Sequence, residues 1–210
     1  MKALFMIGSG GFARECLWLL EQINAPKPQW ELKGIVAPQV PDWSTSVPYL
    51  GDDHKALESL SRDHQFVIAI GGPKIRQALS QKFEAAGFQA ASLIHPTIRL
   101  APSVEIGAGS ILCAGVQTTV NIKIGKHCIL NLNTTVGHEA QIGDFCTLSP
   151  GTNISGAVKI GQGCFLGSGV NVLPGREINP QITLGAGAVV TNHLKAAGVY
   201  VGVPAKKIKD

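Results

Sequence analysis

The sequence predicts two domains, a small parallel α/β sheet followed by a parallel β-helix. Over the first ninety residues, apolar runs typical of strands alternate with helical patterns. From about Ile94 an aliphatic residue returns at every sixth position, and glycine often follows it. All three tryptophans lie before this point, so the composition changes together with the pattern. We therefore expect a front domain over residues 1–93 and a β-helix with a C-terminal cap over residues 94–210.

The front domain is expected to alternate strands with helices. The segments KALFMIG, WELKGIVA, QFVIAIGG and FQAASLI have the composition of strands. The segments FARECLWLLEQI and PKIRQALSQKFEAAG repeat apolar residues at helical spacing, and DDHKALESL opens with an aspartate suited to capping a helix. This order favours a small Rossmann-like parallel sheet covered by helices.

The second domain is predicted from the step of six. Of the seventeen residues found by stepping in sixes from Ile94 to Val190, all but Thr118 are Ile, Leu or Val. Those three types make up about a quarter of the chain, so chance would give far fewer matches. Each hexapeptide is expected to be a short strand and a turn, with its aliphatic anchor pointing inward and three units closing one coil. The unbroken phase predicts nearly six coils, with glycine or another small residue helping each turn.

The cysteines and histidines give no sign of a metal site. Cys128, Cys146 and Cys164 are spaced eighteen residues apart, which stacks them inward on successive coils. The five cysteines include no CxxC pair, and their odd number argues against a disulfide framework. No two histidines have metal-ligand spacing, so we expect no metal.

Charge and composition exclude further classes. The net charge of +4 comes without a long basic run, which disfavours nucleic-acid binding. The apolar start is too short to span a membrane, so we expect no membrane insertion and a soluble, cytoplasmic protein. The stretch GSGGFA fits a dinucleotide fingerprint, but GIVAP after the second strand has no acid for the ribose. Binding of NAD is therefore not expected.

One histidine differs from the other five. His138 is followed by Glu139, and Gly156 lies eighteen residues on, where the repeat places it one coil away beside the imidazole. A histidine oriented by a carboxylate beside a free backbone N–H is suited to acyl transfer. On these residues alone a solvated turn histidine remains the alternative. The others are interpreted as surface residues (His54, His64), a linker residue (His95), an exposed turn residue (His127) and a residue beyond the last repeat (His193).

Three segments resemble the bacterial sugar acetyltransferases of the left-handed β-helix class. They are GHEAQIGDFCTLSPGTNISGAVKIGQGCFLGSG, the ending YVGVPAKKI, and the opening GSGGFARE, which is similar to the GxGGxxxE start of the subgroup's small front domain. That subgroup comprises N-acetyltransferases of nucleotide-linked amino sugars and sialic acid O-acetyltransferases. The resemblance covers almost the whole chain. It implies acetyl-CoA as co-substrate, a small sugar acceptor, a role in surface-glycan biosynthesis, and a homotrimer with active sites between neighbouring copies.

The resemblance also implies roles for individual residues. His138 matches the general base and Glu139 the acid that supports it. Asn131 matches an asparagine near the active site, and Gly156 matches the glycine whose N–H faces the oxyanion. The implied coenzyme contacts are Thr147, Ser168 and Ala186, and the implied sugar-nucleotide contacts are Gly10, Gly11, Phe12 and Gly71. Lys206 and Lys207 are candidates for coenzyme phosphate, with a solvated tail as the alternative.

The chain departs from the family's pattern at three places. Thr147 stands where the family often has histidine. Ala37 and Pro38 stand where it often has an acidic pair, and Gly72 replaces a residue that is often acidic or asparagine. An acceptor without a nucleotide therefore stays open. So do O-acetylation, an acyltransferase for a non-sugar acceptor, and a non-catalytic β-helix binding protein.

Overall fold

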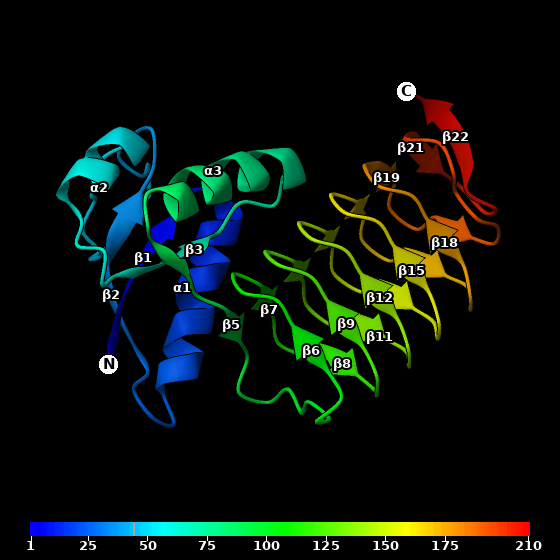
Figure 1. Cartoon of the computed structure of the whole chain (residues 1–210), viewed down its shortest axis with the longest axis horizontal. Helices are drawn as coiled ribbons and strands as arrows, with labels where there is room; N and C mark the ends of the chain where they lie inside the picture. Colours follow the sequence, from blue (N-terminus) through cyan, green and yellow to red (C-terminus); the bar gives the residue numbers. More distant parts are fainter. Residues whose placement is uncertain (44) are drawn as a thin grey trace.

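The front domain is a four-stranded parallel sheet with three helices (Figure 1). The computed structural model describes residues 1–43 and 45–210. The strands are β1 (Lys2–Ile7), β2 (Trp30–Val36), β3 (Gln65–Ile68) and β4 (Gln89–Ala90), in the order β2-β1-β3-β4. The helices are α1 (Gly11–Asn24), α2 (Asp53–Ser59) and α3 (Pro73–Ala85). The predicted small parallel sheet is confirmed.

Each predicted element forms for the reason seen in its sequence. The apolar run of β1 is buried on both faces, as in a parallel sheet covered by helices. The Asp52 side chain accepts a hydrogen bond from the Lys55 N–H at 2.9 Å and so caps α2. Pro73 opens α3, where its missing N–H is not needed.

Two apolar clusters hold the front domain together. One is aromatic, with Phe5, Phe66, Phe83 and Phe88 at centroid distances of 5.3–6.1 Å. The other surrounds α1 and also contains residues of the first β-helix strands, such as Ile111 and Ile129. The two domains therefore share a core.

The β-helix consists of coils stacked along one axis, whose three sides form three parallel sheets, with the front domain at one end and the C-terminus at the other (Figure 1). The first sheet contains β5 (Leu93–Ile94), β7 (Ile111–Leu112), β10 (Ile129–Leu130), β13 (Thr147–Leu148), β16 (Phe165–Leu166), β19 (Ile182–Leu184) and β21 (Gly198–Val201), with β22 (Lys206–Lys209) antiparallel at its edge. The second sheet contains β8 (Gln117–Thr118), β11 (Thr135–Val136), β14 (Asn153–Ile154), β17 (Asn171–Val172) and β20 (Val189–Val190). The third contains β6 (Glu105–Ile106), β9 (Lys123–Ile124), β12 (Gln141–Ile142), β15 (Lys159–Ile160) and β18 (Glu177–Ile178).

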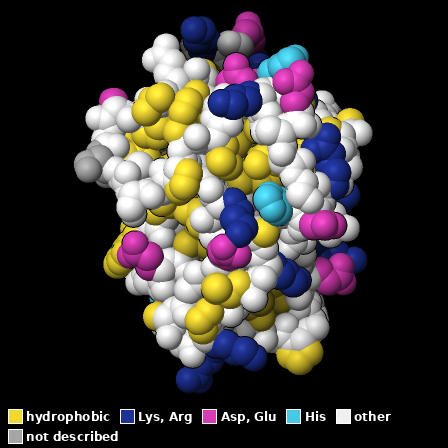
Figure 2. All heavy atoms as spheres, turned by 90° about the vertical axis from the view of Figure 1, so that its left-hand side faces the viewer, with side chains coloured by type: hydrophobic (Ala, Val, Ile, Leu, Met, Phe, Trp, Pro, Cys, Tyr) yellow, Lys and Arg dark blue, Asp and Glu magenta, His cyan; other side chains and the backbone are white. Residues whose placement is uncertain are grey.

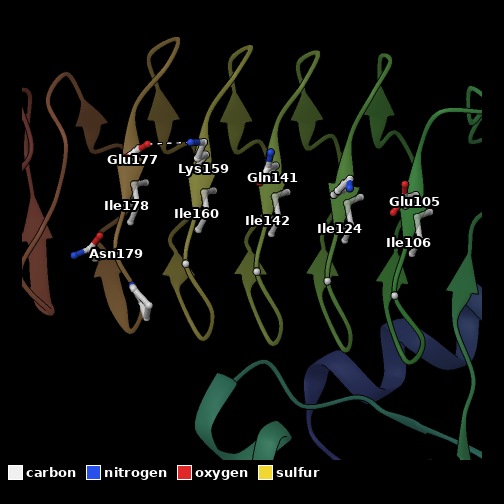
Figure 3. Close-up of a pocket in the computed structure, with 16 residues that line it drawn as sticks. Glu105, Ile106, Ile124, Gln141, Ile142, Lys159, Ile160, Glu177, Ile178 and Asn179 are labelled. Carbon is white, nitrogen blue, oxygen red and sulfur yellow. Dashed lines mark hydrogen bonds and ion pairs between the residues drawn. The ribbon is translucent and has the colours of Figure 1, made fainter.

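The strands pair in the predicted register of eighteen residues. Leu130 pairs with Leu148, for example, and the isoleucine anchors of the third sheet line up from coil to coil (Figure 3). The anchors from Leu112 to Val190 are buried, apart from half-buried Thr118. In the first coil the predicted burial of the anchors is wrong in part, because Leu100 is 39% exposed and belongs to no strand. The second sheet begins one coil late for this reason.

The chain turns at a different residue from the one expected. At every turn from Gly109 to Gly187 the residue three after the anchor has positive φ, and half of these residues are not glycine. Glycine directly after an anchor serves close stacking instead. A Cβ on Gly137 would lie 2.7 Å from the Gly156 nitrogen of the next coil. Turn direction and coil spacing are thus controlled by two separate positions of the hexapeptide.

The inward cysteine stack is confirmed. Cys128, Cys146 and Cys164 are buried, and each thiol donates to a carbonyl fifteen residues further on, at 3.1–3.2 Å. Ser110 does the same one coil earlier, at 2.9 Å. This ladder ties each coil to the next from inside.

Candidate active site

The His138–Glu139 pair lies at the corner between the second and third sheets, after β11. Both side chains are more than 60% exposed, and the imidazole Nδ1 lies 3.6 Å from Glu139 Oε2. This is an electrostatic contact slightly too long for a hydrogen bond. Glu139 occupies a left-handed turn position with φ of 63°, and its N–H donates to the Val120 carbonyl at 3.1 Å. The backbone therefore directs both side chains outward from one corner.

Gly156 lies against the imidazole, one coil further along. A Cβ at this residue would come within 2.5 Å of His138 Nε2, so only glycine leaves the ring its place. Among the hydrogen bonds of the described residues, none uses the Gly156 N–H as donor. Because Glu139 faces Nδ1, the opposite nitrogen Nε2 is the one left to accept a proton beside that N–H.

The remaining family-implied β-helix residues lie at two other places. Asn131 is at the corner between the first and second sheets, where its carboxamide oxygen accepts from the Leu132 N–H at 2.7 Å. Ser168 and Ala186 are exposed at the same corner on later coils, and Gly187 N–H donates to the Ser168 carbonyl at 2.8 Å. One side of the coil separates this corner from His138, and no hydrogen bond of the described residues joins the two.

Thr147, an expected coenzyme contact, lies against the front domain. It points from the first sheet toward the front domain and is only 5% exposed. Its hydroxyl donates to the Gly71 carbonyl at 2.7 Å and accepts from Arg76 Nη2 at 2.9 Å. The donor hydrogen of this hydroxyl is thus used within the chain, and the expected coenzyme contact stays a prediction.

Arg76 is a functional candidate that sequence reasoning missed. It is fully buried near the start of α3, and no carboxylate among the described residues forms a salt bridge with it. Its three nitrogens donate instead to oxygens of both domains at 2.7–3.2 Å: Ile70 O, Gly71 O, His127 O, Phe145 O, Cys146 O and Thr147 Oγ1. Burial lowers the pKa of the guanidinium to about 10, so it remains charged at neutral pH.

The prediction of an exposed turn for His127 is wrong. The ring is 1% exposed and stacks between Phe145, at 5.4 Å, and Phe66, at 6.0 Å. Its Nε2 lies 2.7 Å from Glu84 Oε1 of α3. Burial lowers the pKa of His127, and the hydrogen bond to Glu84 opposes that shift. The sequence contained one signal of this packing. Phe145 follows His127 by eighteen residues and occupies the equivalent turn position, where glycine would adopt the positive φ with the least strain.

The remaining histidines are closer to expectation. His54 is exposed and His64 is half-buried. His95 is buried at the domain junction, with Nδ1 2.8 Å from Thr97 Oγ1. His193 accepts from the Glu177 N–H at 3.1 Å.

The glycine-rich loop after β1 lies beside the loop after β3. Gly8 has φ of 118°, and a Cβ there would lie 2.9 Å from the Ala69 carbonyl oxygen. Gly10 precedes and Gly11 begins α1, whereas a Cβ on Gly10 or Gly71 would meet nothing within 4 Å. Phe12 is half-buried against the core around α1. The loop is braced by Trp43, which donates to the Ser9 carbonyl at 2.7 Å.

A pocket of about 640 Å³ opens next to this loop, at the carboxyl ends of β1 and β2. Its wall includes Gly8, Ala37 and Pro38, but not Gly10, Gly11, Phe12 or Gly71. No acid follows β2, as the sequence indicated, yet Asp52 and Asp53 at the start of α2 line the same pocket. Lys82 donates to Asp53 at 2.6 Å, and this hydrogen bond lowers the pKa of the carboxyl. Ligands of open α/β sheets bind at such carboxyl ends.

Two other hollows lie on the β-helix. One follows the third sheet, where Lys159 pairs with Glu177 at 3.2 Å and no histidine lines the groove (Figure 3). The other, of about 870 Å³, lies between the start of α3 and the later strands of the first sheet.

The end of the molecule formed by the front domain mixes acidic and basic side chains around hydrophobic ones (Figure 2). The described residues on this face show no region of a single charge (Figure 2).

The described residues contain no cluster of His, Cys, Asp or Glu that could hold a metal ion. Within residues 1–43 and 45–210, no helix has the length and apolar character needed to cross a membrane.

The chain is similar to known proteins along both domains. Residues 3–83 match the family model of the PglD N-terminal domain. Perosamine N-acetyltransferase from Caulobacter crescentus, solved as a histidine variant with CoA and GDP-perosamine, is 32% identical with a TM-score of 0.89. That similarity covers 99% of this chain and 97% of the other.

Two further solved structures are similar over their whole length. The acetyltransferase domain of PglB from Neisseria gonorrhoeae, in complex with acetyl coenzyme A, is 27% identical with a TM-score of 0.89, over 99% of both chains. WeeI from Acinetobacter baumannii is 26% identical with a TM-score of 0.84, over 97% of this chain and 98% of the other. No curated protein sequence matches the chain.

Proposed function

Because the chain belongs to the sugar acetyltransferases that join a PglD N-terminal domain to a parallel β-helix, we propose that it acetylates the amino group of a nucleotide-linked sugar. It is an acyltransferase, and acetyl-CoA is its co-substrate. Two structures of the perosamine N-acetyltransferase hold CoA together with GDP-perosamine, and the PglB domain holds acetyl coenzyme A. The N-acetylated product would serve as a glycosyl donor for bacterial surface glycans.

The observation that carries the proposal is the placement of His138 between Glu139 and Gly156. Nδ1 faces the carboxylate, Nε2 lies where a Cβ on Gly156 would project, and the Gly156 N–H has no acceptor among the described residues. A base and an oxyanion donor at one corner are what direct acyl transfer requires. A lone solvated histidine would need neither the carboxylate nor the glycine.

The proposed reaction follows from these positions. The neutral amine of the sugar attacks the thioester carbonyl carbon, and His138 Nε2 takes the proton that the nitrogen loses. The negative charge moves to the carbonyl oxygen, where the Gly156 N–H stabilises it. Collapse of the tetrahedral intermediate breaks the C–S bond, and the imidazolium returns the proton to the CoA thiolate. Glu139 favours the protonated imidazole during this exchange.

No acyl-enzyme is included in the proposal. The thiols of Cys128, Cys146 and Cys164 donate inward to backbone carbonyls and do not reach the His138 corner. The sugar nitrogen therefore attacks the thioester directly.

We further propose that the complete site forms between copies of a homotrimer. Asn131, Ser168 and Ala186 share one corner, while His138 lies at the next. A threefold arrangement of β-helices allows the first corner of one copy to face the second corner of another. Light scattering is expected to give the mass of a trimer, and a monomer at assay concentration would remove the shared-site proposal.

The front domain is proposed to hold the nucleotide at the carboxyl ends of its strands. Gly10, Gly11, Phe12 and Gly71 remain the proposed contacts for the sugar-nucleotide, and the pocket beside them offers Asp52 and Asp53 as acceptors for base or ribose. The acids missing after β2 are thus supplied by α2.

The test is thiol release from acetyl-CoA with a panel of acceptors: GDP-perosamine, a UDP-linked amino sugar, the free amino sugars and sialic acid. Release with a nucleotide-linked amino sugar, abolished in His138→Ala, is the expected result. Release with sialic acid alone would show O-acetylation instead. No release with any acceptor, from a folded trimer, would reject the proposal.

A further inference from the structure

The two domains are joined by a buried polar contact between α3 and the corner that connects the third and first sheets. We call it the interdomain clamp and define it as Arg76, Gly71, Thr147, His127 and Phe145. Arg76 donates to the carbonyls of His127 and Phe145 at 2.7 Å each, and to Thr147 Oγ1 at 2.9 Å. These three oxygens belong to the β-helix.

The same guanidinium also holds the front domain's own loop. Its Nη1 donates to the Ile70 carbonyl at 2.8 Å and to the Gly71 carbonyl at 3.1 Å. The Thr147 hydroxyl adds a second hydrogen bond to the Gly71 carbonyl, at 2.7 Å. The loop after β3 is therefore attached to the β-helix at its tip.

Joining two surfaces through a buried arginine without a carboxylate partner is energetically unfavourable. Taking the charge out of water carries a large penalty, and apolar side chains of similar volume would join the domains at lower energetic cost. Arg76 also lies in the first turn of α3, where the helix dipole disfavours a cation. What the planar guanidinium adds is direction, since its donors have a fixed geometry.

The attached coil is the one that carries the candidate base. Between the turn at His127 and the turn at Phe145, the chain makes one circuit of the β-helix and passes His138 on the way. Strands pair this coil on both sides, so it cannot shift alone.

We infer that Arg76, with Thr147, is a positioning residue that sets the acceptor-binding loop at residues 69–72 relative to the catalytic coil. This rests on the proposed function, in which Gly71 contacts the sugar-nucleotide. Arg76 itself touches no reacting atom. Its effect is confined to the acceptor, because coenzyme contacts and base belong to the β-helix alone.

The kinetic arm of the test compares Arg76→Met with Arg62→Met. Arg62 is a matched control, because it also donates to backbone carbonyls, at 2.8 and 3.0 Å, but only within the front domain. With GDP-perosamine as acceptor probe, Arg76→Met is expected to lower kcat/KM for the acceptor roughly ten- to a hundredfold. The KM for acetyl-CoA is expected to stay within about twofold, and Arg62→Met to change neither value. Arg76→Lys, with fewer donors, is expected to fall between parent and Arg76→Met.

The second arm does not depend on activity. Amide hydrogen exchange at residues 69–72 is expected to become faster in Arg76→Met and in the milder variant Thr147→Val, and to stay unchanged in Arg62→Met. If Arg76→Met does not fold, amide hydrogen exchange is measured on Thr147→Val instead. If the parent acetylates no amino sugar, the proposed function is rejected. Amide hydrogen exchange at residues 69–72 then remains the test of the interdomain clamp.

Unchanged exchange at residues 69–72 in a folded clamp variant would overturn the inference. So would equal loss of kcat/KM for acceptor and acetyl-CoA, which marks a general structural defect. An acceptor kcat/KM within about twofold of the parent in folded Arg76→Met would do the same.

Discussion

Two histidines of one coil, eleven residues apart, have opposite surroundings. His127 and His138 both lie at β-helix corners, three residues after the buried anchor Ile124 and two residues after the buried anchor Val136. His138 is exposed beside Glu139, whereas His127 is enclosed by Phe66, Phe145 and Glu84. The repeat determines the backbone at a corner, and what packs against that corner determines the chemistry of its side chain.

Each histidine also has a glycine one coil away that makes room for its ring. Gly156 lies against His138 on the following coil, and Gly109 lies against His127 on the preceding one. At the exposed corner this room leaves a free N–H beside the ring. At the covered corner it lets the ring stack between two aromatic side chains. The predictions below separate the two corners by activity and by stability.

The largest effect is expected on activity at the exposed corner. His138→Ala should lower kcat about 10²–10⁴-fold, or about 3–5 kcal/mol of barrier, because a general base is lost. Glu139→Ala should lower it less, because the proton acceptor remains. Steady-state kinetics on the true acceptor, with the melting temperature as control, measures both. A kcat for His138→Ala within about threefold of the parent would sink the assignment of the base.

The next effect is expected on stability at the covered corner. His127→Ala leaves a cavity between two aromatic rings and removes the partner of Glu84, so the free energy of unfolding should fall by about 2–4 kcal/mol. Denaturant unfolding measures it, and kcat of the protein that remains folded should be close to that of the parent. A loss below about 1 kcal/mol would contradict the burial of His127.

The two glycines sharpen the comparison with one matched substitution. Gly156→Ala should displace the His138 ring and lower kcat by about tenfold or more, with little change in stability. Gly109→Ala forces a side chain into a backbone with φ of 77° and into the His127 ring, so it should lower stability by about 1–3 kcal/mol and leave kcat per folded molecule unchanged. Interchanged outcomes would mean that the two corners had been assigned the wrong way round.

The smallest effect is the pH dependence of stability. Burial lowers the pKa of His127 below its ordinary value of 6.5, against the opposing hydrogen bond to Glu84. Between the lowered value and 6.5 the unfolded chain binds more protons than the folded one, so stability falls as the pH decreases through this window. Melting temperatures at about pH 7.5 and about pH 5.5 should differ less in His127→Phe, which keeps the stacking without the proton. An equal difference in both proteins would assign the pH dependence to other groups.

The β-helix could be predicted in detail because every hexapeptide buries its anchor in the same way. One anchor such as Leu148 per unit points inward, and it packs with the anchors of neighbouring units while its strand partners lie eighteen residues away. The step of six therefore predicted the register and the cysteine stack. It did not predict the exposure of Leu100, because no strand of an earlier coil pairs there.

The candidate site could be predicted only as far as it is local to the repeat. His138, Glu139 and Gly156 are brought together by adjacency and by the coil period, both of which are visible in the chain. Asp52 and Asp53 could not be assigned to the pocket at the carboxyl ends of β1 and β2, because they approach Ala37 and Pro38 only after the helix α2 has folded over the sheet.

The sequence by itself determined the two domains, the phase of the coils and the outward corner with His138, because periodic burial acts between residues at fixed spacing. Only the tertiary structure decided the roles of Arg76, Thr147 and His127. Their partners lie 51 to 76 residues away along the chain, in the case of Arg76–His127 and Thr147–Gly71. Packing of one domain on the other turns an apparent surface corner into a core, and no periodicity within either domain encodes that contact.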